Sequence, residues 1–462
     1  MSSMSPSPTV LLPHLPPKTL VGIDLITFAS TPNFHGIRDL PPGWHFLYTG
    51  TTESLSIRCG WWFHVGDSAS SEGLDGTVIS PNVGPEVMIW KWDTNTESLA
   101  PMTAATDADR QEAMRYRANL GAVWQAGGLF RYRSRVPLSS LLARGHGPGR
   151  RAPDAQRSHA RDEANEEEGR DDWNGLTDRL SPVVLTRIVG DSRLDVNGQP
   201  CWMLTSASTA RQDSDDLAGL VDSAQASDSL AETIEREESV LSLLPVDLKK
   251  TWREGAVGRE RTEGAQDRSW ALGDLIDRLS ETDGDGARSG EAQVLGELQF
   301  TFLMVLTLMN YSCLQQWKRL LELILTCQSA IKDREVFVRD VLRLLLLQLK
   351  RSDDVDGGLF DLDGEEGGKF LRKLLMKFRI SLYEILDGVS PAVKAEFERL
   401  EAWVKNEYDW ELNRVAFVRK GIVQLEDGEE VELEMNEDDE DDETGEYAPL
   451  VVDLEETTDI HS

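Results

Sequence analysis

The sequence contains few cysteines, and their spacing suits neither a metal site nor a disulfide framework. The four cysteines of the 462-residue chain are Cys59, Cys201, Cys313 and Cys327, and no two of them form a CxxC pair. A structural zinc ion needs four closely arranged Cys or His ligands, so we expect no metal and no cofactor. Scattered cysteines in a chain of this length indicate reduced thiols buried in the core.

Basic charge is also scarce. The chain has 48 Lys and Arg residues against 81 Asp and Glu residues, which gives a formal net charge of −33. Proteins bind nucleic acid largely through Lys and Arg side chains that displace counterions from the phosphates. Residues 426–443 alone hold 13 acidic residues and no basic one, so the rest of the chain is less acidic than the total implies. It still shows no dominant basic patch, and no direct nucleic-acid contact is predicted.

The chain lacks the short motifs of nucleotide-binding and hydrolytic enzymes, and it lacks a membrane-length apolar run. Neither GxxxxGK[ST] nor GxSxG occurs, so neither a phosphate loop nor a nucleophile elbow is predicted. The apolar stretch Leu298–Leu314 contains Gln299, Asn310 and Ser312 and is shorter than the roughly 20 apolar residues that span a bilayer. Met1–Pro17 lacks the features of a signal peptide. We therefore expect no membrane association and no catalysis.

Three histidines keep one enzymatic alternative open. His35, His45 and His64 fall in the same region of the chain, and residues of a catalytic triad meet in space and not in sequence. No two histidines of the chain are four residues apart, so no helix presents a zinc pair. A deep polar pocket that gathers these three side chains would favour an enzyme. The other interpretation is that each is a hydrogen-bonded residue of a sheet or turn.

What is present in residues 20–101 is a series of short apolar segments separated by turn residues, which predicts a β-rich region. In Glu86–Trp92, Val87 and Ile89 alternate with Met88, Trp90 and Trp92 on the other face. The adjacent Trp61 and Trp62 must point to opposite faces of a strand. One of them therefore needs a second layer or a partner, and we expect a sheet core more than a peptide-binding surface.

A helix is predicted at Asp107–Asn119, with Thr106 or Asp107 as its N-cap. Residues 144–172 have no apolar period and are predicted to be a disordered linker. Leu185–Val189 and Cys201–Leu204 are predicted as short strands. The Ser- and Asp-rich residues 206–229 are expected to form a loop.

From Ser269 the pattern becomes helical. Val294–Cys327 is more apolar than a surface helix needs, so it is expected at the centre of a bundle. Further helices are predicted at Val336–Lys350, Lys369–Leu386 and Pro391–Tyr408, the last with Ser390 as N-cap.

The chain is thus expected to be an α+β protein, with a β-rich N-terminal domain before an all-α helical-bundle C-terminal domain, disordered insertions and an acidic tail. The predicted parts are a β-rich domain at 18–143, a disordered insertion at 144–172, a connecting segment with short strands and a Ser/Asp-rich loop at 173–268, a helical domain at 269–420, and an acidic spacer with a strand-forming tail at 421–462.

The tail carries the main candidate binding site. Beyond the acidic spacer lies an apolar, β-branched stretch, Tyr447–Leu454, which is typical of a segment that adds a strand to a sheet edge. The candidate partner-binding residues are Leu450, Val451, Val452 and Leu454. The alternative is that the tail docks on the helical domain of its own chain. Ser229 is a candidate phosphorylation site, because an acidic residue follows three positions later.

Several short strings occur in a characteristic order along the chain. In the β-rich half they are Val21–Asp24 (VGID), Phe34–Arg38 (FHGIR) and Pro41–Phe46 (PPGWHF). In the rest of the chain they are Leu244–Lys249, Gly258–Thr262, Asp267–Trp270, Val294–Phe300 (VLGELQF), Gln316–Leu321 (QWKRLL), Trp410–Leu412 and Ala448–Leu454. Together these strings resemble the signature blocks of the A1 cistron-splicing factor family. The departures are insertions at positions already expected to be loops.

The resemblance implies a β-rich N-terminal domain, a helical C-terminal domain and no catalysis. It also implies a partner, the large central scaffold protein of the U5 snRNP. Such factors hold its RNase-H-like and Jab/MPN domains together and keep the spliceosomal RNA helicase away until maturation ends. A protein of this kind is expected to be monomeric when free and to occur in cytoplasm and nucleus. The alternative function is a generic interaction scaffold outside splicing.

Overall fold

The computed structural model describes residues 7–51, 57–66, 87–136, 155–210, 240–283, 287–352, 367–384, 391–413, 419–424 and 430–435. The chain divides into two compact units, residues 1–400 and residues 401–462.

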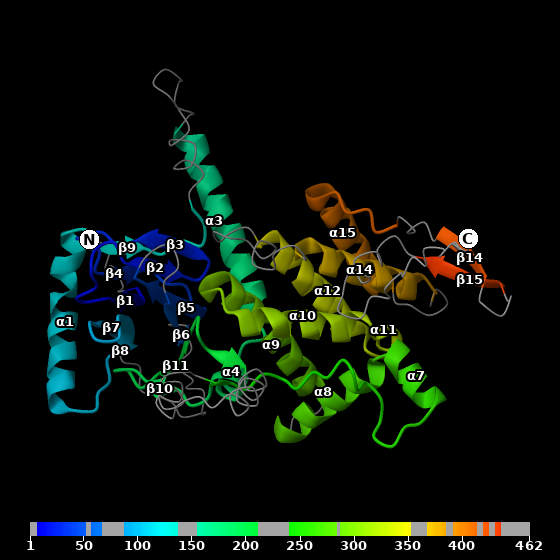
Figure 1. Cartoon of the computed structure of the whole chain (residues 1–462). Helices are drawn as coiled ribbons and strands as arrows, with labels where there is room; N and C mark the ends of the chain where they lie inside the picture. The colour runs from blue at the N-terminus through cyan, green and yellow to red at the C-terminus, as the bar shows by residue number, and fades with distance from the viewer. Residues whose placement is uncertain are drawn as a thin grey trace, which may run out of the picture. The chain divides into compact units, whose positions relative to one another are not determined.

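Two sheets form the N-terminal part of the first unit (Figure 1). The five-stranded sheet has the order β8-β7-β1-β4-β9. Its strands are β1 (Thr9–Leu11), β4 (Gly36–Arg38), β7 (Val87–Asp93), β8 (Ser98–Pro101) and β9 (Leu129–Arg131). The six-stranded sheet has the order β10-β11-β6-β5-β2-β3. Its strands are β2 (Leu20–Ile23), β3 (Ile26–Ala29), β5 (Gly43–Gly50), β6 (Arg58–Val65), β10 (Arg193–Leu194) and β11 (Pro200–Thr205). The predicted β-rich region is confirmed.

The core between the sheets is rich in aromatic side chains. Trp61 of β6 lies edge-on to Trp90 of β7, with ring centroids 5.9 Å apart, and its Nε1 donates a hydrogen bond of 2.7 Å to the Leu99 carbonyl. Strand β7 alternates as predicted: Met88, Trp90 and Trp92 belong to this core. The opposite face of β7 packs against α1 (Asp107–Gln125), where Val87 and Ile89 join Ala113 in a second apolar cluster.

Thr106 caps α1 with a reciprocal pair of hydrogen bonds. Its side chain accepts from the Asp109 backbone N–H, and the Asp109 carboxylate accepts from the Thr106 backbone N–H, each at 3.1 Å. This arrangement satisfies two backbone donors that the first helical turn leaves unpaired. The predicted helix and its N-cap are confirmed, and the helix continues six residues beyond the predicted end, to Gln125.

Two predictions for the connecting region are wrong. Residues 155–172 belong to α3 (Ala155–Thr177) and are not a disordered linker. The stretch lacks an apolar period because most of α3 is polar and only its C-terminal end reaches the core, through Trp173 and Leu176. Leu185–Val189 lies in α4 (Pro182–Val189) and not in a strand, because Ser181 caps the helix and Pro182 fits its first turn. The strand predicted at Cys201–Leu204 is confirmed as part of β11.

Helices form the rest of the first unit. They are α7 (Arg259–Gln266), α8 (Ser269–Asp283), α9 (Ala287–Leu308), α10 (Tyr311–Leu325), α11 (Ala330–Asp333), α12 (Glu335–Lys350), α14 (Gly367–Glu384) and α15 (Pro391–Tyr408), whose last residues belong to the second unit. The short β12 (Thr209–Ala210) and β13 (Val240–Leu241) pair in parallel beside them. The predicted α+β class, with helices after the β-rich part, is confirmed.

The apolar run Val294–Cys327 is central, as predicted, but it forms two helices. All residues from Val294 to Leu308 are buried, which is typical of a helix surrounded by other elements. The helix ends where Met309 takes a left-handed conformation, φ 56°, and Asn310 then caps α10.

The second unit contains a hairpin of β14 (Arg419–Gln424) and β15 (Glu430–Met435). The acidic run was predicted to be a disordered spacer, and for its residues 430–435 this is wrong. Val431 and Leu433 alternate there with glutamates, and an alternation of this kind suits a strand.

Candidate functional site

The residues proposed for partner binding lie outside the described part of the chain. Leu450, Val451, Val452 and Leu454 belong to residues 436–462, and Ser229 belongs to residues 211–239; the structure describes neither range. Their roles stay predictions.

His45 lies in a buried polar cluster and not in an open pocket. Its Nδ1 is 2.8 Å from Asp24 Oδ2, and its Nε2 is 2.8 Å from the Pro41 carbonyl oxygen. Asp24 also accepts hydrogen bonds from the Tyr132 hydroxyl at 2.6 Å and from the Phe46 backbone N–H at 3.0 Å. Because both ring nitrogens face acceptors, both must donate, and this requires the imidazolium form.

The charge state of His45 follows from this geometry. Burial by itself would lower the pKa of His45, but the charge of Asp24 and the hydrogen bonds to Asp24 and Pro41 raise it above the usual value of 6.5. A protonated ring with both nitrogens engaged cannot accept a proton from a nucleophile. His45, on β5, therefore stabilises the turn between β2 and β3 through Asp24 and does not act as a base.

The three histidines of the β-rich region do not meet. The pairing of β5 with β6 sets His45 opposite Phe63 and Trp44 opposite His64. Neighbours along a strand point to opposite faces, so His45 and His64 lie on different sides of the sheet. The His35 ring contacts its own neighbour, with Nδ1 2.9 Å from the Phe34 carbonyl oxygen. The enzymatic alternative required these three histidines to meet in one pocket, and they do not.

The described residues contain no group of three or more His, Cys, Asp or Glu side chains arranged to hold a metal. Among the described helices, none combines the length and the apolar character that a bilayer crossing requires. All four cysteines are free and buried, as predicted. Burial raises the pKa of the Cys59 thiol to about 11, so this thiol is a poor nucleophile at neutral pH.

The second face of the six-stranded sheet is covered by helices of the same chain. Trp62 stacks on Trp173 of α3, with ring centroids 6.1 Å apart and an interplanar angle of 15°, and contacts Phe300 of α9. The Trp173 Nε1 donates a hydrogen bond of 2.7 Å to the Trp44 carbonyl. Both adjacent tryptophans of β6 are therefore core residues. The predicted second layer consists of α3 and α9 of this protein.

Buried polar side chains fasten the sheet to the helices near the α9–α10 turn. Asn310 Nδ2 lies within hydrogen-bond distance of three carbonyl oxygens at or after the end of β11, the shortest at 2.7 Å to Ser208. Arg58 of β6 donates to the Thr307 carbonyl at 2.8 Å. A helix that ends inside a core must have its free carbonyls satisfied, and Arg58 does this for the end of α9.

A second cluster surrounds Glu297 on α9. The Glu297 side chain is fully buried and accepts from Arg187 Nη1 at 2.6 Å, from the Leu244 N–H at 2.8 Å and from Gln316 Nε2 at 2.8 Å. Two residues further on α9, Gln299 accepts from the Arg179 backbone N–H at 3.0 Å. These contacts hold α4, α9, α10 and the segment before α7 together.

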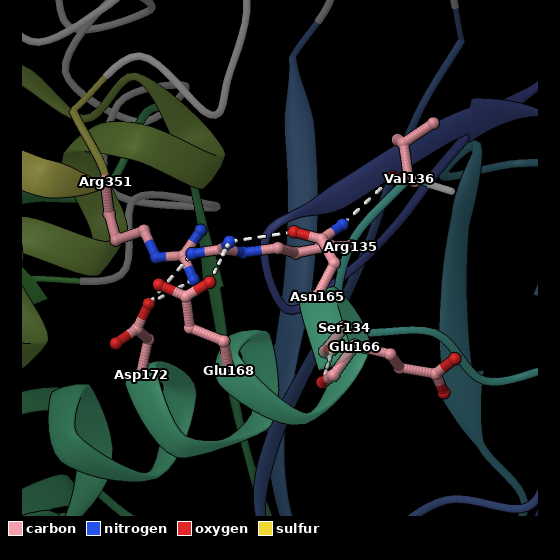
Figure 2. A network of polar contacts seen from close by, with 8 residues as sticks. All are labelled: Ser134, Arg135, Val136, Asn165, Glu166, Glu168, Asp172 and Arg351. Atoms are coloured by element: carbon pink, nitrogen blue, oxygen red, sulfur yellow. Dashed lines mark hydrogen bonds and ion pairs between the residues drawn. The ribbon is translucent and has the colours of Figure 1, made fainter. Parts of the chain in front are cut away.

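A third cluster lies where α3 meets the segment after β9 and the end of α12. Arg135 and Arg351 approach α3 from two sides (Figure 2), and both donate to the Asp172 carboxylate, Arg135 at 3.0 Å. Arg135 also donates to Glu168 and to the Asn165 side chain, at 3.0 and 2.9 Å. The Arg351 side chain is 4% exposed, so its charge needs this partner.

The second cluster contains polar residues from two of the strings that carry the family resemblance. Glu297 and Gln299 belong to the string Val294–Phe300, and Gln316 belongs to Gln316–Leu321. Their polar groups bond backbone and charged groups of other elements, so these strings specify how the two halves join. The sequence signal that could have found them is the presence of Glu and Gln within apolar helical runs, because buried polar residues need partners.

Comparisons with known proteins cover the same two halves. The AAR2 N-terminal domain matches residues 6–190, and the AAR2 C-terminal repeat region matches residues 243–413. The human protein AAR2 homolog is 24% identical over 415 residues, covering 87% of this chain and 89% of the relative. The mouse protein AAR2 homolog is 25% identical over 407 residues, with the same coverage. The chain therefore belongs to the AAR2 family, the family of A1 cistron-splicing factors.

Proposed function

We propose that this protein is a non-catalytic assembly factor of the spliceosomal U5 snRNP. In this role it binds the large scaffold protein of the particle through its RNase-H-like and Jab/MPN domains. It keeps the RNA helicase away until maturation is complete. The observation that carries the proposal is membership of the AAR2 family across both halves of the chain.

The geometry of the first unit supports a holding role. The sheet face that carries Trp62 and the helices around α9 are joined by buried hydrogen bonds. A body of this kind can present surfaces at fixed distances from one another, because packed interiors deform little. Partner domains that bind to two of its surfaces would be held in one arrangement.

The tail is proposed to supply the main contact. In an added strand, backbone hydrogen bonds give affinity and alternate side chains give specificity. Leu450, Val452 and Leu454 point to one side of such a strand, and Val451 points to the other. Removal of residues 446–462 is expected to weaken scaffold binding at least tenfold, which corresponds to about 1.4 kcal/mol.

Isothermal titration calorimetry with the scaffold protein's RNase-H-like and Jab/MPN domains tests this proposal. Replacing Leu450, Val452 and Leu454 with Ser should reproduce most of the loss. The matched control, Val451→Ser, should keep most of the affinity. Unchanged affinity after deletion of 446–462 would overturn the role of the tail. No binding by the intact chain would overturn the assignment to the U5 snRNP.

Two further features are proposed to modulate this binding. The acidic residues 426–443 serve mainly as a solvating spacer, and competition for a basic RNA-binding surface is the alternative, since segregated charge steers association. Binding measured across a salt series separates the two, because competition through charge weakens as salt rises. A phosphate on Ser229 adds negative charge, so Ser229→Glu is expected to weaken scaffold binding.

The free protein is proposed to be monomeric and to occur in both cytoplasm and nucleus. The alternative function, a generic scaffold outside splicing, would appear in immunoprecipitation with mass spectrometry as a set of partners without U5 components.

A further inference from the structure

Basic residues are concentrated on α14 although the chain as a whole is strongly acidic. This helix of 18 residues contains five Lys or Arg residues and a single acidic residue, Glu384 at its end. The whole chain, by contrast, has a net charge of −33. A local reversal of this size gives this part of the surface a potential that attracts negatively charged groups.

The lysines of α14 share one face. Lys369, Lys373 and Lys377 are exposed and follow one another at intervals of four residues, so they lie along one side of the helix, about 6 Å apart. The opposite side packs into the core through five buried side chains: Leu371, Leu374, Leu375, Phe378 and Leu382. Burial of that side fixes the orientation of the lysine row toward solvent.

Neighbouring helices extend the positive charge. Lys318 of α10 places its Nζ 4.9 Å from the centre of the Phe370 ring, and Lys394 of α15 places its Nζ 5.7 Å from the centre of the Tyr383 ring. Arg379 lies over the same Tyr383 ring at 4.8 Å. We call this surface the basic face; it consists of Lys318, Lys369, Arg372, Lys373, Lys377, Arg379 and Lys394.

An apolar side chain completes the basic face. Ile380 lies on the same side of α14 as the lysine row and is 56% exposed. An exposed isoleucine beside lysines suits a ligand that carries both negative charge and an apolar group. An acidic peptide segment with aliphatic side chains has this composition.

We propose that the basic face binds an acidic segment of a protein partner, with Ile380 in contact with an aliphatic side chain of that segment. The contact is separate from strand addition by the tail. It therefore gives the protein a second point of attachment, and two linked contacts raise the overall affinity beyond that of either one.

Nucleic acid is the other polyanion that a basic surface can bind, but the side chains of the basic face suit an acidic peptide better. Single-stranded nucleic acid binds through aromatic rings on which bases stack. The rings of Phe370 and Tyr383 already have cations over them, and the exposed side chain in the row is Ile380. The net charge of the chain also opposes a long polyanion more than a short segment, because screening limits charge effects to about 8 Å at physiological salt.

The test uses the full chain and two fluorescent probes of twelve units. One is a peptide with three repeats of Glu-Glu-Asp-Leu, and the other is an oligouridylate RNA. We expect fluorescence anisotropy to show binding of the peptide in preference to the RNA. The double variant Lys373→Glu with Lys377→Glu should weaken peptide binding at least tenfold.

A matched control separates the site from total charge. Lys249→Glu with Lys250→Glu makes the same change in net charge at two exposed lysines elsewhere in the first unit, and it should change peptide affinity by less than twofold. Equal losses in the two double variants would overturn the proposal, and so would RNA binding as tight as peptide binding. Circular dichroism checks that both variants keep the helical content of the parent.

One more variant tests whether the chain itself occupies the basic face. Residues 353–366 lie between α12 and α14 and contain seven acidic residues. Replacing these seven with Asn or Gln should leave peptide affinity within about threefold of the parent. Peptide binding that appears only after this replacement would overturn the proposal, because the chain's own acidic segment would then be the occupant.

Discussion

Asp24 shows how one carboxylate can fix a turn. It lies in the turn between β2 and β3 in a left-handed conformation, φ 55°, which Asp tolerates better than most residues. Its two oxygens accept from His45, Tyr132 and the Phe46 backbone. The cluster is buried, so removing one of these groups would leave its partner unpaired and lower the free energy of unfolding.

At this scale we predict a pH dependence of stability. The folded-state pKa of His45 lies above its usual value of 6.5, so the folded state holds the proton more tightly than the unfolded state. The resulting contribution to the free energy of unfolding is complete below about pH 6.5 and is lost as pH rises through the folded pKa. Replacing His45 with Gln should therefore cost roughly 1–3 kcal/mol at pH 5.5 and less at pH 9.

Urea denaturation of the parent and His45→Gln between pH 5.5 and 9 measures this difference. Tyr132→Phe is the control, because it removes a hydrogen bond to Asp24 without changing charge over this range. Its cost should stay nearly constant with pH. A cost of His45→Gln that grows with rising pH would contradict the imidazolium assignment.

At the scale of elements, the turn between α9 and α10 connects the helices of the first unit to its six-stranded sheet. Asn310 caps α10 through its Oδ1, which accepts from the Cys313 N–H at 2.9 Å, while its Nδ2 reaches the carbonyls after β11. We predict that Asn310→Ala lowers the free energy of unfolding by roughly 2–4 kcal/mol. About 1 kcal/mol comes from the lost cap, and the rest comes from carbonyls left without a donor.

Thr106→Ala is the matched control for this prediction, because Thr106 caps α1 at an exposed site. It should cost about 1 kcal/mol. Chemical denaturation of both variants gives the comparison. If Asn310→Ala costs no more than Thr106→Ala, the Nδ2 contacts contribute nothing to the junction.

Elements were predictable where local pattern and tertiary packing agree. Strand β7 alternates strictly, and its two faces meet two separate cores. Helix α4 was missed because its β-branched residues favour a strand, whereas Ser181 and Pro182 specify a helix start. Helix α3 was missed because Trp173, near its C-terminal end, brings only that part of the helix to the sheet.

At the scale of the whole molecule, the sequence reveals two halves but not how they are joined. Trp62 needed a second layer, and nothing near it in sequence says that Trp173 and Phe300 provide it. The same limit applies to the candidate sites. The basic face contains side chains from three helices. The net charge of the whole chain is strongly negative, so composition alone does not reveal this face.

We predict that the β-rich half does not fold stably alone. A fragment of residues 1–190 lacks β10, β11 and α9. The six-stranded sheet therefore loses two strands, and its face with Phe46, Tyr48 and Trp62 loses Phe300 and its neighbours. The fragment should aggregate or show tryptophan emission shifted to longer wavelength, whereas residues 1–413 should unfold in a single calorimetric transition. A soluble, monomeric 1–190 fragment with a cooperative thermal transition would contradict this.

The stacked pair of Trp62 and Trp173 has an optical consequence. Two indoles whose centroids are 6.1 Å apart couple their excited states, and the coupling vanishes when the rings separate. One ring belongs to a strand and the other to a helix encoded much later in the chain. The near-ultraviolet circular dichroism that this pair contributes therefore appears during refolding only when the sheet and α3 pack against each other.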